Sequence, residues 1–440
     1  MNPTLGDLQK IFITLGASKI LLKPLAENDN SKQQIYLGGG FGALNELPFG
    51  AITTHTDCKI PNFKAKVDFS WLSANGKFVP APHAQLILYP SYPEVRLSGF
   101  LFGCAAGPSR WMQPIPRDQR KGKDILDGRV LFMAVTPAGK IYAYLAPPQS
   151  TASCEVLKRI NSGKLAIAGD AGVLYFIPLT GIANTTGRDA LLTQLLVIHS
   201  KHWIPGNRLQ ADGQVVPYRA SNGGGYTLEA ELGIRPNGNA APDFQGWEVK
   251  ASADARITLM TPEPDSGHYG THGVESFIRK YGYERPDGTW YFTGLHRVGE
   301  RQKKTRQLLT LKGFDPVTEK ITDINGGIVL FDQDGSPSAG WTYPRLIEHW
   351  GRKHANAAYV PYQKNVDNQY WFHGPVLLGT GTSFDKFLSA MHIGEVFYDP
   401  APKISPVMGS GGSRVKARSQ FRTTKKSLPS LYDSFESIDL

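Results

Sequence analysis

The chain has 440 residues, a length that predicts two or three domains. Its formal net charge of +10 fits a polyanionic partner such as nucleic acid, although basic proteins without such a partner share this balance. Its three cysteines are far apart and form no CxxC pair, which argues against a disulfide framework or a zinc knuckle. The chain begins without a secretion signal and contains no apolar run of about 18 residues, so we expect a cytoplasmic protein without a membrane partner.

Residues 1–150 have the pattern of a strand-rich domain, because short apolar runs alternate with turns rich in Gly, Pro and Asn. The runs predict strands at 19–23, 34–37, 84–89, 130–135 and 140–145. This arrangement predicts a barrel or sandwich. Residues 151–185 are expected to form a linker and connecting segment, with a buried strand at 172–177.

Residues 186–440 mix helical and strand patterns, which predicts an α/β domain. Helices are expected at 190–198, 276–281, 343–354 and 383–391. Strands are expected at 247–251, 289–292, 308–311 and 327–331. The sequence therefore predicts two folded domains of different secondary structure.

One short string in the second domain carries the residue types of metal-dependent phosphodiester cleavage. Asp243 follows a turn signal at Pro242, and Glu248 and Lys250 lie two apart, so on a strand they share one face. Mg2+ prefers oxygen ligands, which Asp243 and Glu248 can supply. Lys250 beside them can orient an attacking water and favour its hydroxide form. The same pattern is also typical of a surface strand that carries a Glu/Lys pair.

The segments around this string resemble the MvaI/BcnI branch of type II restriction endonucleases, which is related to the DNA-nicking enzyme MutH. The similarity includes Glu229, fourteen residues before Asp243, and the Asp-x4-Glu-x-Lys spacing. It continues at residues 348–361 and 384–399. The resemblance implies a restriction-endonuclease-like core of the PD-(D/E)xK type.

The resemblance also implies roles for particular residues. The catalytic set would be Glu229, Asp243, Glu248 and Lys250. Asp243 and Glu248 would hold Mg2+, and Glu229 would lie on a helix and hydrogen-bond Lys250 or a metal-bound water. Glu231 is an alternative to Glu229 in this role.

The activity implied by the resemblance is Mg2+-dependent hydrolysis of double-stranded DNA at a short CCNGG-type site, with CCWGG as the specific expectation. A monomeric enzyme and a cognate DNA methyltransferase in the cell are also implied. A MutH-like repair nickase and a non-catalytic DNA-binding protein are the alternatives. Residues 416–422 lack a His that some relatives carry before a Phe-Arg pair, so no base-reading role is transferred to them.

The N-terminal domain is similar to the EcoRII effector domain, a pseudobarrel of the plant B3 type, at residues 23–37. This similarity implies a DNA-binding domain that holds a second copy of the site and stimulates cleavage, as in type IIE enzymes. Acids accept hydrogen bonds from cytosine and Arg pairs with guanine, so Glu94 and Arg96 are candidate base readers. A surface ion pair on one strand face is the alternative. Further candidate DNA contacts are Lys23, Asn28, Asn30, Lys32, Gln33 and Gln34.

Two further patterns occur in the second domain. Residues 296–306 are rich in cations that can hold a phosphate backbone, although a solvated loop has the same composition. The candidate contacts are Arg297, Arg301, Lys303, Lys304 and Arg306, next to His296. His268 and His272 have the spacing of a metal pair, but the surrounding Gly and Pro predict a loop and no zinc role.

Overall fold

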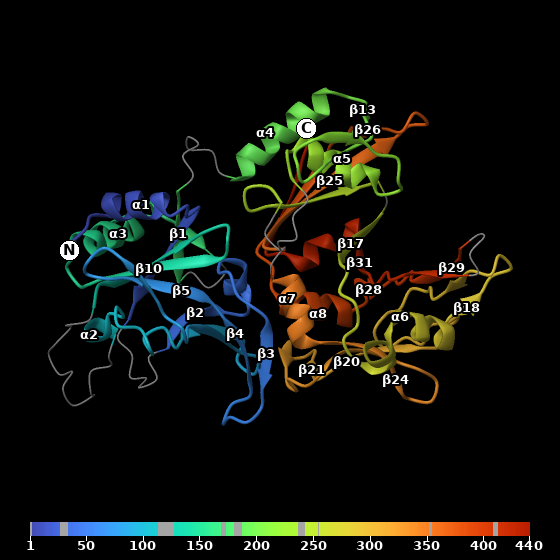
Figure 1. Cartoon of the computed structure of the whole chain (residues 1–440), viewed down its shortest axis with the longest axis horizontal. Coiled ribbons are helices and arrows are strands. Elements are labelled where there is room, and N and C mark those ends of the chain that lie inside the picture. Colours follow the sequence, from blue (N-terminus) through green and yellow to red (C-terminus); the bar gives the residue numbers. More distant parts are fainter. Residues whose placement is uncertain are drawn as a thin grey trace. The chain divides into compact units, whose positions relative to one another are not determined.

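The computed structural model describes residues 2–26, 34–112, 127–168, 173–179, 187–235, 243–253, 255–351, 354–407 and 412–440. The chain divides into two compact units, Met1–Ala183 and Asn184–Leu440 (Figure 1). No helix among the described residues is long and apolar enough to cross a membrane.

The first unit contains two sheets. The seven-stranded sheet has the order β11-β12-β1-β9-β10-β5-β6. Its strands are β1 (Lys19–Leu25), β5 (Asp68–Leu72), β6 (Phe78–Pro80), β9 (Arg129–Val135), β10 (Lys140–Ala146), β11 (Ala166–Ala168) and β12 (Leu174–Pro178). The five-stranded sheet has the order β2-β8-β7-β4-β3. Its strands are β2 (Ile35–Gly39), β3 (Ile52–His55), β4 (Asn62–Lys66), β7 (Gln85–Tyr89) and β8 (Glu94–Ser98). The expected strand-rich domain is present, and neither sheet closes on itself within the described residues.

Two helices of the first unit cover one face of the seven-stranded sheet. Helix α1 (Leu5–Thr14) begins with a capping box between Thr4 and Asp7, which satisfies backbone N–H groups at the helix start. Its buried residues pack with those of α3 (Thr151–Asn161) against the apolar side chains of β1 and β9. The unit also contains the short helices α2 (Ser109–Met112) and η1 (Gly42–Asn45).

The segment expected to be a linker is part of the first unit. Within residues 151–183, α3 buries Ala152 and Val156 in the apolar core of this unit. Strand β12 pairs antiparallel with β1 along residues 175–178. The boundary therefore lies at residues 183/184 rather than at residue 150, because a segment that supplies a sheet strand and a core helix cannot be a free connector. The Pro-Pro sequence at 147–148 had indicated a linker, but it only precedes the helix.

The second unit contains a six-stranded sheet and two helices against it. Five strands have the order β13-β26-β25-β27-β32, and β16 pairs with β25. The strands are β13 (Ile204–Pro205), β16 (Glu248–Ser252), β25 (Asn356–Lys364), β26 (Gln369–Phe372), β27 (Val376–Thr380) and β32 (Ser434–Ile438). Helices α4 (Gly187–Ser200) and α5 (Gly223–Glu231) pack their apolar side chains on one face of this sheet.

A second group of elements forms another lobe of the same unit (Figure 1). Its helices are α6 (Gly267–Tyr281), α7 (Tyr343–Trp350), α8 (Phe384–His392) and η3 (Lys425–Leu431). One three-stranded sheet joins β17 (Arg256–Met260), β31 (Phe421–Thr424) and β28 (Val396–Tyr398). Another joins β20 (Leu308–Lys312), β23 (Gly327–Phe331) and β24 (Pro337–Thr342). A four-stranded sheet joins β18 (Tyr283–Glu284), β19 (Trp290–Tyr291), β29 (Lys403–Pro406) and β30 (Ser413–Lys416). Two-stranded ribbons pair β14 (Asn207–Leu209) with β15 (Val215–Pro217), and β21 (Phe314–Asp315) with β22 (Lys320–Ile321).

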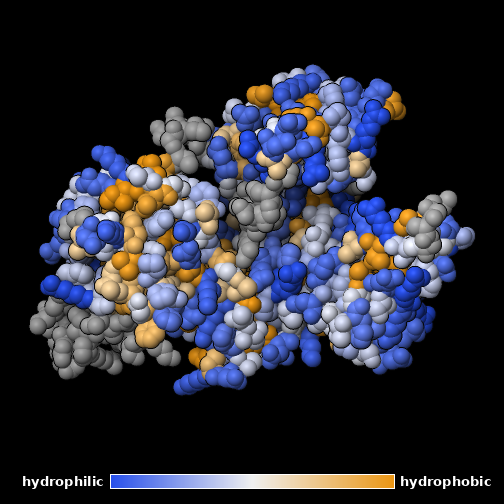
Figure 2. Space-filling view, viewed as in Figure 1, coloured by the Kyte–Doolittle hydropathy of each residue, from blue (hydrophilic) through white to orange (hydrophobic). Residues whose placement is uncertain are grey.

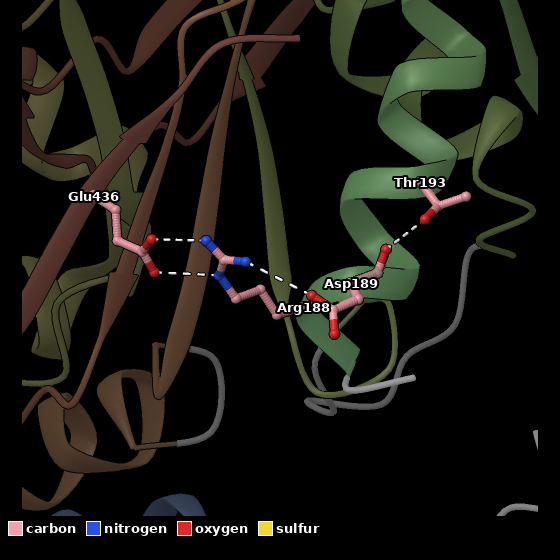
Figure 3. Close-up of polar contacts among 4 residues, drawn as sticks. All are labelled: Arg188, Asp189, Thr193 and Glu436. Atoms are coloured by element: carbon pink, nitrogen blue, oxygen red, sulfur yellow. Dashed lines mark hydrogen bonds and ion pairs between the residues drawn. The ribbon is translucent and has the colours of Figure 1, made fainter. Parts of the chain in front are cut away.

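An ion pair joins the two ends of the second unit. Arg188, near the start of α4, donates from Nε and Nη2 to the Glu436 carboxylate on β32, at 3.2 and 2.7 Å (Figure 3). Arg188 also lies 3.6 Å from Asp189, and Thr193 donates to the Asp189 carbonyl. The fork-like geometry fixes the helix start relative to the last strand, although partial exposure of both side chains limits its energy to about 1 kcal/mol.

The prediction that His268 and His272 lie in a loop is wrong. Both lie on α6, with ring centroids 4.4 Å apart, because they are separated by one helical turn. Of the glycines within α6, Gly273 has a non-helical backbone, with a φ of 80°, and interrupts the helix. His268 Nε2 is 2.9 Å from the Ser276 hydroxyl, across this interruption.

Helix α5 begins with three consecutive glycines, and the space around each shows how closely the helix packs on the sheet. A Cβ on Gly224 would meet the Tyr362 ring at 2.4 Å, whereas a Cβ on Gly225 meets nothing within 4 Å. We expect Gly224→Ala to lower the free energy of unfolding by about 1–3 kcal/mol, because the helix must move off the sheet. Gly225→Ala should be neutral or stabilise by up to about 1 kcal/mol. Urea unfolding of both variants measures the difference, and equal effects would contradict the described packing.

Candidate active site

The pairing of β16 with β25 decides which side chains face the site. The strands are parallel, with Glu248 opposite Ala357 and Lys250 opposite Tyr359. Because side chains alternate along a strand, Glu248 and Lys250 share one face. Val249 lies on the other face, within the apolar core beneath α4 and α5. The expected shared face for the acid and the lysine is therefore present.

The Asp243-x4-Glu248 spacing has a structural cause. Phe244 and Trp247 exchange two backbone hydrogen bonds, at 2.9 and 2.8 Å, and so close a two-residue turn. Gln245 and Gly246 both have positive φ, 44° and 88°, as a type I′ turn requires. The turn places Asp243 beside Glu248, with Asp243 Oδ2 accepting from the Val249 backbone N–H at 3.2 Å.

Glu248 and Lys250 form a sheltered ion pair. Lys250 Nζ lies 2.9 Å from Glu248 Oε1, and the side chains are 19% and 6% exposed respectively. Burial acts to lower the pKa of Lys250, but the Glu248 carboxylate together with Tyr359 and Asp243 outweighs this effect, so the pKa is raised. Lys250 therefore remains an ammonium and supplies charge and N–H donors rather than a basic nitrogen.

Asp243 and Glu248 are mutually repulsive carboxylates. Burial and the negative charge of Glu248 raise the pKa of Asp243 to about 7, while the Val249 N–H and Lys250 act in the opposite direction. A divalent cation between such groups removes the repulsion and keeps both ionised. The donor set of these two carboxylates therefore fits a hard divalent ion. Among the described residues, no group of three or more His, Cys, Asp or Glu side chains has the arrangement of a protein-only metal site.

Helix α5 carries the third expected acid. Glu229 is half-buried on this helix, which packs against β16. Its alternative, Glu231, is engaged elsewhere: Lys201 Nζ lies 2.7 Å from its carboxylate, and Asn207 donates to it at 3.4 Å. Lys201 and Asn207 thus hold the Glu231 carboxylate, and the role of Glu229 in the site stays a prediction.

Two buried tyrosines line the same face and were not expected from the sequence. Tyr359 and Tyr432 place their hydroxyl oxygens 2.7 Å apart. Burial raises the pKa of Tyr359 to about 12, and Glu248 and Lys250 both act on this group. A Cβ on Gly379 would meet the Tyr432 ring at 2.5 Å, so the ring lies directly on the sheet. Tyr432 is far from the motif in sequence, and a lone Tyr carries no signal of such a contact.

The candidate readers of the first unit lie on the five-stranded sheet. Glu94 and Arg96 form an ion pair at 2.8 Å on one face of β8. Arg96 also donates to Gln34 Oε1 at 3.3 Å. Lys23 lies on β1 in the other sheet, where burial lowers its pKa. Asn28, Asn30, Lys32 and Gln33 lie outside the described residues.

The basic segment 296–306 contains fewer free cations than expected. His296 is fully buried, and this burial lowers its pKa to about 4, so it is neutral and structural. Arg297 donates to the Gly394 carbonyl, and Arg301 to the Arg306 carbonyl. Lys303 and Arg306 are exposed, and Lys304 Nζ lies 3.5 Å from the Tyr283 ring centroid. The segment remains a candidate phosphate-binding surface.

Comparison with known proteins identifies the family of the chain. The model of the MvaI/BcnI restriction endonuclease family matches residues 192–432, more than half of the chain, and the chain belongs to this family. It is therefore a restriction endonuclease with a mixed α/β core in its second unit, a site-specific deoxyribonuclease. The matched residues lie entirely within that unit.

Similar solved structures include two of the restriction endonuclease MvaI. One is its complex with cognate DNA, at 15% identity and a TM-score of 0.43. The other is MvaI in the absence of DNA, at 14% identity and a TM-score of 0.32. Each match covers 58% of this chain and 99% of the other chain. No curated protein sequence matches the chain.

The raised pKa of Asp243 predicts pH-dependent metal binding. Below about pH 7 this carboxyl is protonated in the metal-free protein, so a divalent cation must displace a proton. Affinity for Ca2+ should therefore rise with pH between about 6 and 7.5 and then level off. Calorimetry in buffers of different ionisation enthalpy should detect the released proton. Affinity that is independent of pH in this range would contradict the proximity of the two carboxylates, and Asp243→Asn should abolish the proton release.

Proposed function

We propose that the protein hydrolyses phosphodiester bonds of double-stranded DNA in a Mg2+-dependent reaction centred on Asp243, Glu248 and Lys250. The observation that carries this proposal is the turn at Gln245 and Gly246, which places the two carboxylates and the ammonium together at one strand end. A structural ion pair alone would not need a second carboxylate whose pKa is raised by the first.

Each residue of this group has a distinct role in the proposed reaction. Asp243 and Glu248 would hold the cation, which when bound neutralises phosphate charge and acidifies a bound water. Lys250 uses one N–H toward Glu248, and its other N–H groups can face the attacking water or the scissile phosphate. Water would add to phosphorus and lose one proton to solvent, one P–O ester bond would break with the leaving oxygen taking up a proton, and the ammonium would stabilise the charge that develops. Glu229 would position Lys250 or a bound water.

The target that we propose is a CCNGG-type site, with CCWGG as the specific candidate. Family membership supports this class of target, and the basic segment around Lys303, Lys304 and Arg306 supports contact with the backbone. We further propose that the enzyme acts as a monomer. A DNA methyltransferase that modifies the same site would protect the cell's own DNA.

We propose that the first unit is a B3-like effector domain that binds a second copy of the site. Glu94 and Arg96 lie on an open five-stranded sheet, and the ion pair holds the Arg side chain ready to meet guanine. Lys23, Asn28, Asn30, Lys32, Gln33 and Gln34 are proposed as further contacts. Binding there would stimulate the second unit, which defines type IIE behaviour.

Variants at the catalytic face test the proposed chemistry. Asp243→Ala and Lys250→Ala should reduce the single-turnover cleavage rate by at least about 100- to 1,000-fold, because the first removes a proposed ligand of the cation and the second removes positive charge beside the transition state. Duplex binding in Ca2+, followed by fluorescence anisotropy, should remain close to wild type. Glu229→Gln should impair cleavage, whereas Glu231→Gln is the matched control and should not. Full cleavage by Lys250→Ala would refute the assignment.

Plasmid digestion tests the effector role and the target together. A plasmid with two sites should be cut faster than one with a single site, and a short site-bearing duplex should accelerate cutting of the single-site plasmid. Glu94→Ala with Arg96→Ala should remove this acceleration without abolishing basal cleavage. Equal rates with and without the added duplex would end the effector proposal. Sequencing of the fragment ends identifies the site, and nicked product alone would indicate a MutH-like enzyme.

A further inference from the structure

The four-stranded sheet β18-β19-β29-β30 presents a row of aromatic and basic side chains on one face. Directly opposed residues in antiparallel strands share a face. Tyr283 pairs with Tyr291, Tyr291 with Lys403, and Lys403 with Lys416. Arg414 lies two residues before Lys416 and therefore on the same face. The β30 cations are separated by about 6.6 Å along the strand.

The other face of this sheet is already occupied. Its row contains Glu284, Trp290, Ile404 and Val415. Ile404 is 2% exposed, and Arg279 from α6 lies 5.2 Å from the Trp290 ring centroid. Helix α6 packs against β19 and β29 on this side. The aromatic and basic row therefore belongs to the outward face, and the visible surface of this lobe is mainly hydrophilic (Figure 2).

The cations of the outward face are held by aromatic rings rather than by acids. Arg285 lies 4.2 Å and Lys403 lies 5.9 Å from the Tyr291 ring centroid, and Lys304 lies 3.5 Å from that of Tyr283. Within the described part of the chain, no ion pair to a carboxylate involves these three side chains, Arg414 or Lys416. By contrast, Arg422 and Arg256 in the neighbouring sheet share Asp399.

Two observations indicate that this face is built for an anion. Lys403 and Lys416 are directly opposite each other, an arrangement that costs stability unless a negative charge lies between them. The nearby acids form no close ion pair with these cations among the described residues: Asp287 accepts from the Thr289 N–H in the β18–β19 turn and acts on Arg285 only from beyond ion-pair distance, and Glu284 belongs to the inner row. Among the described residues, no carboxylate lies within ion-pair distance of Lys403, Arg414 or Lys416.

We propose that the outward face of β18-β19-β29-β30, with Lys304 beside it, binds the phosphate backbone of duplex DNA that flanks the cleavage site. A polyanion with regularly spaced phosphates matches a flat row of cations that side-by-side strands hold in register. The tyrosine rings orient the cations and are themselves covered by them, so the surface contacts phosphates and does not stack on bases. This inference rests on the proposed function and assigns a role to Lys403, Arg414 and Lys416.

The test is the salt dependence of DNA binding by the full-length protein. Arg414→Gln with Lys416→Gln changes two exposed side chains on the edge strand, and Arg279→Gln with Lys280→Gln is the matched control on α6, behind the sheet. Anisotropy with a site-bearing and a site-free duplex in Ca2+ gives log Kd against log salt. For the edge-strand variant, the slope of log Kd against log salt should decrease by about 1–2. Its affinity should fall by the same factor for both duplexes. The control should keep the wild-type slope.

Three outcomes would overturn the inference. An unchanged slope in the edge-strand variant, a loss of affinity confined to the site-bearing duplex, or an equal loss in the control would each do so. Thermal melting of each variant checks that the fold is retained, and Lys403→Gln provides a second variant within the same row. The proposed function fails if the wild-type protein does not cut DNA. The inference alone fails if the wild-type protein cuts DNA normally and the edge-strand variant keeps the wild-type salt dependence of binding.

Discussion

Two backbone hydrogen bonds between Phe244 and Trp247 determine where Asp243 and Glu248 lie in the second unit. They close a turn whose central residues both need positive φ, and this turn returns Asp243 to the start of β16. Phe244 and Trp247 point into the apolar core, so Asp243 and Glu248 necessarily point the other way. Asn356 donates to the Gly246 carbonyl at 3.2 Å and ties the turn to β25. The same turn therefore buries Phe244 and Trp247 in the core and places the Asp243 and Glu248 carboxylates on the opposite side.

The six-stranded sheet of this unit packs the apolar core on one face and carries the proposed catalytic group on the other. One face packs on α4 and α5 and contributes Val249, Ala358 and Val360 to the core. The other face holds the acid–lysine pair beside the Tyr359–Tyr432 hydroxyl contact. The buried tyrosines exclude water from one side of the pair, which strengthens its electrostatic interactions. The four-stranded sheet β18-β19-β29-β30 carries a different kind of surface, in which Arg285, Lys304 and Lys403 lie over tyrosine rings and form no ion pair with a carboxylate among the described residues.

Local patterns in the sequence predicted some features well. The strand at β16, the shared face of Glu248 and Lys250, and the family followed from residue types and spacing. Features set by tertiary contacts were missed. His296 belongs to a cation-rich segment of the sequence, but complete burial keeps it neutral. Gly and Pro near His268 indicated a loop, yet the prolines precede helix α6, and the helix accommodates its glycines with one interruption at Gly273. Tyr432 reaches the site only because β27 and β25 place Gly379 beneath its ring.

The location of a divalent cation tests the central claim most directly. The Lys250→Ala variant should cleave slowly and retains both carboxylates, so it can be crystallised with a site-bearing duplex and Mn2+. Anomalous scattering at the manganese edge should then give a peak in contact with Asp243, Glu248 and the scissile phosphate. A peak bound to other side chains, with Asp243 and Glu248 remote from the DNA, would contradict the account of this turn as the cutting centre.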